Sequence, residues 1–222
     1  MCHSSCIIFG AVNLKKEEIA GKRVIELGAC EVNGSLRPLI ESYGPAEYVG
    51  VDIVAGPGVD VVCPAEKVLE KFGPASFDIV ITTEMLEHVR DWRTAISNIK
   101  NICRPNGIIL ITTRSIGFIY HAHPHDFWRY ETSDLERIFA DCQIEKLESD
   151  KMDPGVFLKA RKPADFIETD LRPISLFSII EGGRVAEVDE NKLAAFHAKF
   201  ERRQKIKQAY NRFYRCVKSW LS

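Results

Sequence analysis

The chain has 222 residues and a formal net charge of -1, so its overall charge does not indicate a nucleic acid or an acidic membrane as a partner. Its content of 45% hydrophobic and 27% charged residues is typical of a globular protein that buries a core without disulfides. The 7 cysteines form no C-x-x-C pair, which favours free thiols. Together with apolar runs too short to span a bilayer and no signal-peptide pattern, this predicts a cytoplasmic protein.

Strand and helix patterns alternate from residue 15 to about residue 142. Short apolar runs rich in β-branched residues predict strands, and segments with helical spacing separate them. We expect strands at residues 23–27, 48–53, 59–62, 77–82, 108–112, 144–147 and 156–160, and helices at residues 15–20, 36–43, 65–72, 92–102 and 135–140. The first five strands are nearly continuous apolar runs, which is typical of parallel strands covered on both faces. The predicted fold class is therefore α/β, a Rossmann-like doubly wound seven-stranded sheet.

The regular alternation stops at Lys162, so we expect a domain over residues 1–162 and a C-terminal extension over residues 163–222. The end of the extension, Glu190–Leu221, has the pattern of one long basic amphipathic helix. Its apolar positions are Leu193, Phe196, Phe200, Ile206, Tyr210, Phe213, Val217 and Trp220. We expect this face to pack onto its own domain or onto a second copy of the chain as a homodimer. Docking to a membrane surface is a less favoured alternative, and no nucleic acid is expected as a partner.

Three segments follow predicted strands, at the edge where an open α/β sheet binds its ligand. The first is the turn from Gly28 to Gly34, whose glycines allow a sharp bend and a close approach of the backbone. The second is Asp52, whose carboxylate can accept both hydroxyls of a ribose. The third is the segment at residues 82–89, TTEMLEHV. The turn lacks the G-x-G-x-x-G spacing of a dinucleotide site, so a cofactor without a pyrophosphate fits it better.

These motifs resemble a known family. Glu26-Leu27-Gly28 after an apolar strand, Asp52 at the next strand end, and Phe77-Asp78-Ile79-Val80 followed by Leu86-Glu87-His88-Val89 are similar to the class I methyltransferases, specifically the methyltransferase-11-like group. The resemblance covers about residues 22–147. It implies the seven-stranded sheet of that class and S-adenosyl-L-methionine as the cofactor.

The resemblance also implies contacts for each part of the cofactor. The methionine end would lie against Gly28, Ala29 and Gly34, with Glu26 acting at that end from the strand tip. Asp52 would hold the ribose, and Ala65 and Glu66 would lie beside the adenine. Thr83 and Glu84 would supply contacts under the sulfonium.

The segment HAHPHDFWRY, residues 121–130, follows the fifth predicted strand and lies at the acceptor side of the expected site. His125 or His123 can act as a base, because an imidazole titrates near neutral pH, and Asp126 can orient it. On the substrate side we expect Trp128, Arg129, Tyr130 and, from the earlier segment, His88. In the alternative structural interpretation, Asp126 and Arg129 pair with each other and Trp128 locks the loop to the core.

We therefore expect an enzyme that transfers a methyl group from S-adenosylmethionine to an oxygen atom of a small polar acceptor. The acceptor class we expect is a sugar or another metabolite. One alternative is a cofactor-binding module that its basic tail docks to a membrane or an assembly. The other is a metal-dependent hydrolase that uses the His121–His125 loop, because histidines at alternate positions are common metal ligands. Pro124 and the lack of further acidic ligands at useful spacing argue against the hydrolase, so no metal is expected.

Overall fold

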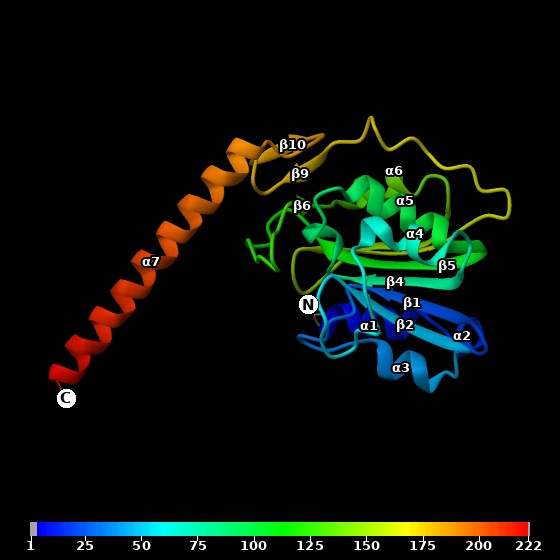
Figure 1. Cartoon of the computed structure of the whole chain (residues 1–222), viewed down its shortest axis with the longest axis horizontal. Helices are drawn as coiled ribbons and strands as arrows, with labels where there is room; N and C mark the ends of the chain where they lie inside the picture. The colour runs from blue at the N-terminus through cyan, green and yellow to red at the C-terminus, as the bar shows by residue number, and fades with distance from the viewer. Residues whose placement is uncertain (1–3, 222) are drawn as a thin grey trace.

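The structure is a computed structural model that describes residues 4–221, except for the side chains of residues 213–217 and 219–221. Figure 1 shows a central sheet with helices on both sides and one long C-terminal helix that extends away from it. In chain order, the elements are α1 (Ser4–Asn13), α2 (Lys16–Ile19), β1 (Arg23–Leu27), α3 (Arg37–Ser42), β2 (Glu47–Asp52), β3 (Val61–Val62), η1 (Ala65–Lys67), α4 (Val68–Phe72), β4 (Phe77–Thr83), η2 (Leu86–His88), α5 (Trp92–Ile102), β5 (Cys103–Arg114), β6 (Trp128–Arg129), α6 (Thr132–Ile138), β7 (Gln143–Ser149), β8 (Gly155–Arg161), β9 (Leu176–Ser178), β10 (Gly183–Val185) and α7 (Glu190–Leu221).

The main sheet has seven strands in the order β3-β2-β1-β4-β5-β8-β7. The strands from β3 to β5 are parallel, and β8 is antiparallel to both of its neighbours. The predicted seven-stranded, doubly wound α/β fold is thereby confirmed. Strand β5 begins earlier than expected, because Cys103 pairs with Phe77 before the register of β4 and β5 shifts.

Each face of the sheet is covered by its own set of helices (Figure 1). Side chains alternate between the two faces of a strand, so Val80 packs with α4, α5 and α6, whereas Ile79 and Ile81 pack with α1, α2 and α3. Helix α1 was not predicted as a helix. It covers the sheet by burying Cys6 and Phe9, and these two residues alone carry too little periodic signal to identify it from sequence.

The first part of the C-terminal extension belongs to the core of the molecule. Strand β9 pairs with β6 and β10 pairs with β9, forming a second sheet of three strands. The Arg93 guanidinium donates to the backbone carbonyls of Leu171, Ile174 and Ala186, which ties this segment to α5. Residues 163–188 thus share the core with the sheet, and no break in packing lies at residue 162. Strands of two or three residues have no detectable period, so the sequence did not reveal them.

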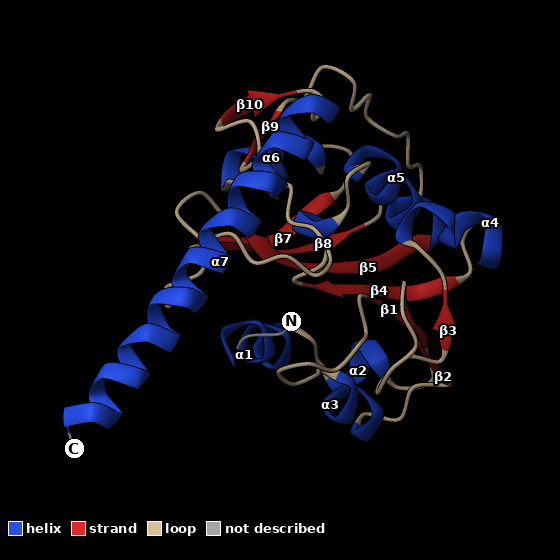
Figure 2. Cartoon of the chain, turned by 60° about the vertical axis from the view of Figure 1, so that its left-hand side comes forward, coloured by secondary structure: helices blue, strands red, loops and turns tan. Residues whose placement is uncertain are grey.

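Helix α7 begins after Asp189, whose carboxylate accepts the backbone N–H groups of Asn191 and Lys192 as an N-cap. Its first turns contact the domain through the Phe196 and Phe200 rings, which lie 4.9 and 4.8 Å from the Tyr120 ring. Residues 201–212 are all exposed, and the helix projects away from the sheet in both views (Figures 1 and 2). The expectation that the helix packs along its own domain is therefore wrong beyond Phe200.

The other expectations for α7 concern its last apolar side chains, a membrane surface and a second copy of the chain. The side chains of Phe213, Val217 and Trp220 lie outside the described residues. None of the helices within residues 4–221 combines the length and the apolar run that a bilayer-spanning segment needs. Pairing with a second copy of the chain stays a prediction.

The projection of α7 has a measurable consequence for stability. Ile206 is 60% exposed, so we expect Ile206→Ser to change the free energy of unfolding by no more than about 0.5 kcal/mol. In contrast, Phe196→Ala removes a ring packed on Tyr120 and should cost about 1–2 kcal/mol. Urea unfolding measures both changes. A loss above about 1 kcal/mol for Ile206→Ser would mean that this face is covered in solution.

Candidate active site

A cleft of about 670 Å³ opens beyond the carboxyl ends of β1, β2 and β4. Its wall comes from the turn after β1, the end of β2, the η1 region, the segment after β4 and the histidine loop, and one residue of α7 reaches it. The lining residues are Leu27, Gly28, Cys30, Val32, Val51, Asp52, Ile53, Val54, Cys63, Pro64, Ala65, Glu66, Glu84, Met85, His88, Val89, Arg90, Ala122, His123, Pro124, His125, Phe127 and Leu193.

Gly28 and Asp52 stand at neighbouring strand ends on one side of this cleft. Gly28 has a φ of 81°, and a Cβ atom placed there would lie 2.7 Å from the Met85 Cβ atom, so only glycine fits. The Asp52 carboxylate accepts the backbone N–H of Cys30 at 3.1 Å and that of Val54 at 3.2 Å. These two bonds fix its direction and leave further lone pairs for a ligand with hydroxyl groups.

Large apolar side chains surround Asp52 without being buried by the protein. Val32, Ile53 and Val54 line the cleft and are 52%, 50% and 53% exposed. A group of exposed apolar side chains around a polar anchor is typical of a small-molecule site. This side of the cleft therefore suits a ligand that joins a flat apolar ring to a sugar.

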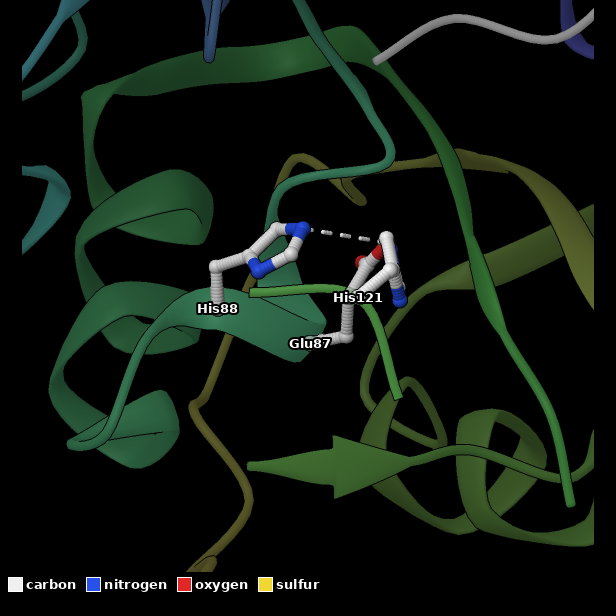
Figure 3. Close-up of side chains that lie close together, drawn as sticks. All are labelled: Glu87, His88 and His121. Atoms are coloured by element: carbon white, nitrogen blue, oxygen red, sulfur yellow. Dashed lines mark ion pairs between the residues drawn. The ribbon is translucent and has the colours of Figure 1, made fainter. Parts of the chain in front are cut away.

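Next to His88, which lines the cleft, a buried carboxylate lies between two histidines. Glu87 is fully buried, and its Oε1 atom lies 3.8 Å from His88 Nε2 and 3.7 Å from His121 Nε2 (Figure 3). Burial acts to raise the pKa of Glu87, but the neighbouring His121 and His88 rings hold it well below its usual range. Burial also opposes protonation of His121, yet Asp126 and Glu87 raise its pKa to about 9.

The histidine loop is held by a buried ion pair. The Arg129 guanidinium donates two hydrogen bonds to the Asp126 carboxylate, at 2.5 and 2.8 Å, and both side chains are buried. Burial would raise the pKa of Asp126, but the bonds from Arg129 and His121 lower it to about 2. The backbone N–H of His121 also donates to Asp126, so the pair fixes the start of the loop against the core.

Comparison with known proteins identifies the family. Residues 10–145 match the model of the methyltransferase domain family. The chain belongs to this family. It is a class I S-adenosylmethionine-dependent methyltransferase.

Individual relatives are distant. The ubiquinone biosynthesis O-methyltransferase of Idiomarina loihiensis is 28% identical over 117 residues, which is 47% of this chain and 47% of that protein, so the match spans about half of the relative. A chain in the complex of the Haloferax volcanii Trm112 methyltransferase activator with a methyltransferase has a TM-score of 0.57, with 15% identity over 72% of this chain and 90% of that chain. An S-adenosylmethionine-dependent methyltransferase from Mesorhizobium loti has a TM-score of 0.52, with 16% identity over 72% and 98%. At these identities the structural likeness shows the fold.

Five of the nine residues expected to hold the cofactor line the cleft of this methyltransferase. They are Gly28, Asp52, Ala65, Glu66 and Glu84. The Glu84 side chain is nevertheless buried and paired with Arg114. Burial, followed by the nearby Glu87 carboxylate, raises the pKa of Glu84. The Glu84 carboxylate thus binds Arg114 inside the protein in place of the contact expected with the cofactor.

Glu26 and Thr83 lie outside the lining of the cleft and correct the expectation for the methionine end. The Tyr48 hydroxyl donates to the Glu26 carboxylate, and the Thr83 hydroxyl lies 3.5 Å from it. Burial raises the pKa of Glu26. Both residues are buried.

Ala29 and Gly34 lie outside the lining as well. Ala29 is 4% exposed, and its methyl group would be 3.1 Å from a Cβ atom at Gly50, so it packs against β2. A Cβ atom at Gly34 would lie 2.9 Å from Ile7 Cδ1, so this glycine serves the close approach of α1. The turn therefore presents Gly28 and Cys30 to the cleft in their place.

On the acceptor side, His88, His123 and His125 line the cleft as expected, whereas four other candidates lie outside its lining. The Asp126 and Arg129 side chains form an ion pair with each other. The Trp128 indole N–H donates to the carbonyls of Val89 and Arg90, and the Tyr130 hydroxyl donates to the Leu86 carbonyl. The substrate contacts expected of Trp128, Arg129 and Tyr130 and the base-orienting role expected of Asp126 are replaced by internal contacts, in line with the alternative interpretation that these residues hold the loop to the core.

Sequence reasoning missed Met85, Phe127 and Leu193 as lining residues, and it did not group Glu87 with His121. Met85 lies within the segment at residues 82–89 and Phe127 within the segment at residues 121–130, so membership of these segments was the available signal. Leu193 lies in the extension, and no local pattern points it toward the cleft. Of the three alternating histidines, only His121 joins the Glu87 cluster.

Proposed function

We propose that this methyltransferase acts on a small polar molecule and transfers the methyl group to an oxygen atom. The observation that carries the proposal is the arrangement of the cleft, with Gly28 and Asp52 on one side and a group of histidines on the other. The enclosed volume of about 670 Å³ suits a cofactor together with a small acceptor. The relative from Idiomarina loihiensis, which is named an O-methyltransferase, supports oxygen as the acceptor atom.

In this proposal, the Asp52 carboxylate accepts the ribose hydroxyls, and Val32, Ile53 and Val54 cover the adenine together with Ala65 and Glu66. Gly28 lets the methionine end approach the backbone. S-adenosylmethionine, when bound, supplies a methyl carbon that the adjacent sulfonium activates. The residues around it exclude water and align the acceptor in line with the breaking C–S bond.

The acceptor hydroxyl loses a proton as the new O–C bond forms. His123 and His125 line this part of the cleft, and an imidazole is a suitable base at neutral pH. The His125 ring stacks on His197 of α7, with ring centroids 5.4 Å apart, so the extension helps to hold it. His88 Nδ1 donates to the His125 carbonyl, which leaves His88 in a positioning role.

The absence of a C-x-x-C pair in the sequence is the basis on which we propose a cytoplasmic location. The first turns of α7 contribute Leu193 to the cleft. This contact supports a role of the extension in the enzyme itself and favours methyl transfer over a module that only docks to a membrane or an assembly.

Calorimetric titration with S-adenosylmethionine and S-adenosylhomocysteine tests the proposed site. We expect micromolar binding that Asp52→Ala weakens by about 1–3 kcal/mol, because the ribose hydroxyls lose a buried polar partner. Asp170→Ala, which changes an exposed carboxylate paired with Arg172, is the control and should bind as the wild type does. Equal cofactor affinity of Asp52→Ala and Asp170→Ala would show that Asp52 does not bind the cofactor. Transfer of a labelled methyl group to a panel of hydroxylated acceptors then tests the acceptor atom.

A further inference from the structure

We propose that Glu87, His88 and His121 form a binding site for one divalent transition-metal ion that adjoins the cofactor cleft through His88. Each residue offers one ligand atom, and the three atoms lie within 4.8 Å of one another. Figure 3 shows the three side chains pointing toward one another. Glu87 and His88 come from η2, and His121 comes from the histidine loop after β5, so the fold brings together ligands from two separate segments.

In each of the three side chains, one nitrogen or oxygen atom has a polar contact within the protein. The other nitrogen or oxygen atom is the one that would bind the metal. His88 Nδ1 donates to the His125 carbonyl, so the lone pair of this ring is on Nε2. His121 Nδ1 lies 3.1 Å from the Asp126 carboxylate, which leaves Nε2 to face Glu87. The Thr113 hydroxyl donates to Glu87 Oε2 at 2.9 Å and leaves Oε1 free. Partners of this kind, which orient a ligand from behind, accompany metal-binding histidines and carboxylates in general.

Two of the three ligand atoms also lack other partners. Glu87 Oε1 and His88 Nε2 are buried, and neither has a hydrogen-bond partner among residues 4–221. The separations of 3.8 and 3.7 Å around Oε1 are too long for hydrogen bonds. A buried polar atom without a partner is costly. A cation between the three atoms satisfies all of them. Ligands about 2.0–2.2 Å from a metal are about 3.0–3.4 Å apart, so the two imidazole nitrogens must move toward Oε1 by a few tenths of an ångström. The widest pair of the three atoms, which lies within 4.8 Å, must close by up to about 1–2 Å.

The ligand types indicate the class of metal. Two imidazole nitrogens and one carboxylate suit Zn²⁺, Fe²⁺ or Mn²⁺, whereas Mg²⁺ prefers oxygen ligands. Three protein ligands leave coordination positions open. Of the three ligands, His88 lines the cleft together with His123 and Phe127, so the site adjoins the cleft through this ring.

The role of the ion rests on the proposed function, but its binding does not. A cation at this place can bind the oxygen of the acceptor hydroxyl and lower its pKa. The hydroxyl proton then passes to a neighbouring imidazole or to water, the oxygen forms its bond to the methyl carbon, and the C–S bond breaks to leave S-adenosylhomocysteine. The expected acceptor class is therefore a hydroxylated molecule with a second oxygen placed to chelate the ion.

Equilibrium dialysis of the EDTA-treated full chain against Mn²⁺ and Zn²⁺, without S-adenosylmethionine, tests the site directly. We expect one ion per chain in the wild type and in His123→Gln, which alters a neighbouring histidine of the same cleft. His88→Gln and His121→Gln should each weaken binding by tenfold or more. Relaxation of water protons by bound Mn²⁺ should show at least one open position. Circular dichroism checks the fold of each variant, and Thr113→Val, which removes only the hydroxyl behind Glu87, replaces His121→Gln where that variant does not fold.

Binding of less than one ion per chain by the wild type would overturn the proposal and leave the cluster a structural ion pair between protonated His121 and Glu87. Unchanged affinity in His88→Gln and His121→Gln would overturn it too, as would an equal loss in His123→Gln, which would place the metal elsewhere in the loop. Calorimetry with S-adenosylhomocysteine in the metal-free chain separates the two proposals. Cofactor binding without metal binding would overturn only this inference. Metal binding without cofactor binding would overturn only the proposed function.

Discussion

Asp126→Asn is expected to lower the free energy of unfolding by about 3–5 kcal/mol, the usual result of removing one partner of a buried ion pair. Arg129 is 1% exposed and Asp126 is 0% exposed, so the variant leaves a buried guanidinium with a neutral partner. The Asp126 carboxylate also accepts the His121 backbone N–H, so the histidine loop should loosen as well. Urea unfolding followed by circular dichroism measures the loss.

The matched control is Asp170→Asn. Asp170 forms a comparable pair with Arg172, but both side chains are at least half exposed, and solvent screening leaves pairs of this kind with little effect on stability. The double variant Asp126→Leu/Arg129→Met should lose less than Asp126→Asn, because no charge is then left buried. A loss below about 1 kcal/mol in Asp126→Asn would show that the loop does not depend on this pair.

Gly28→Ala is expected to weaken binding of S-adenosylhomocysteine by at least tenfold and to cost about 2–3 kcal/mol of stability. A φ of 81° costs an alanine about 1–2 kcal/mol. The new methyl group would also lie 2.7 and 2.8 Å from the Met85 Cβ and Cγ atoms, so Met85 must shift in the wall of the cleft. Calorimetry measures the affinity and thermal unfolding measures the stability.

Gly44→Ala separates the two causes. Gly44 has a similar φ of 72°, and no atom lies within 4 Å of a Cβ atom placed there. This variant should show the conformational cost alone, with cofactor affinity unchanged. If Gly28→Ala binds the cofactor as tightly as Gly44→Ala does, the close approach at Gly28 plays no part in the site.

Much of the sheet was predictable because its signals are local. Residues 23–27 and 77–82 are apolar runs that end at the cofactor edge, and both appear as strands there. The position of Asp52 in the cleft followed for the same reason, since the carboxyl ends of parallel strands share one edge. The side to which a strand-tip residue turns was not predictable. Glu26 has the right place in the chain, but Tyr48 on the neighbouring strand holds it in the interior.

The histidine loop shows where local reasoning ends. Its composition identified a loop at the acceptor side, and His123 and His125 lie in the cleft as expected. Composition alone could not decide between substrate contact and internal pairing for Arg129, because both use the same charged group. The Glu87 cluster and the strands of the extension depend on residues that are distant in the chain, and a single sequence contains no record of such contacts.

The sequence by itself determined the class of fold, the chain order of the seven strands of the main sheet and the edge at which we propose that the cofactor binds, because apolar periodicity and strand-end residues are properties of neighbouring positions. Only the tertiary structure decided which polar side chains face the cleft and which are paired inside. Burial of a charge requires a partner, and Arg129, Glu26 and Glu84 each have one that only the folded chain supplies.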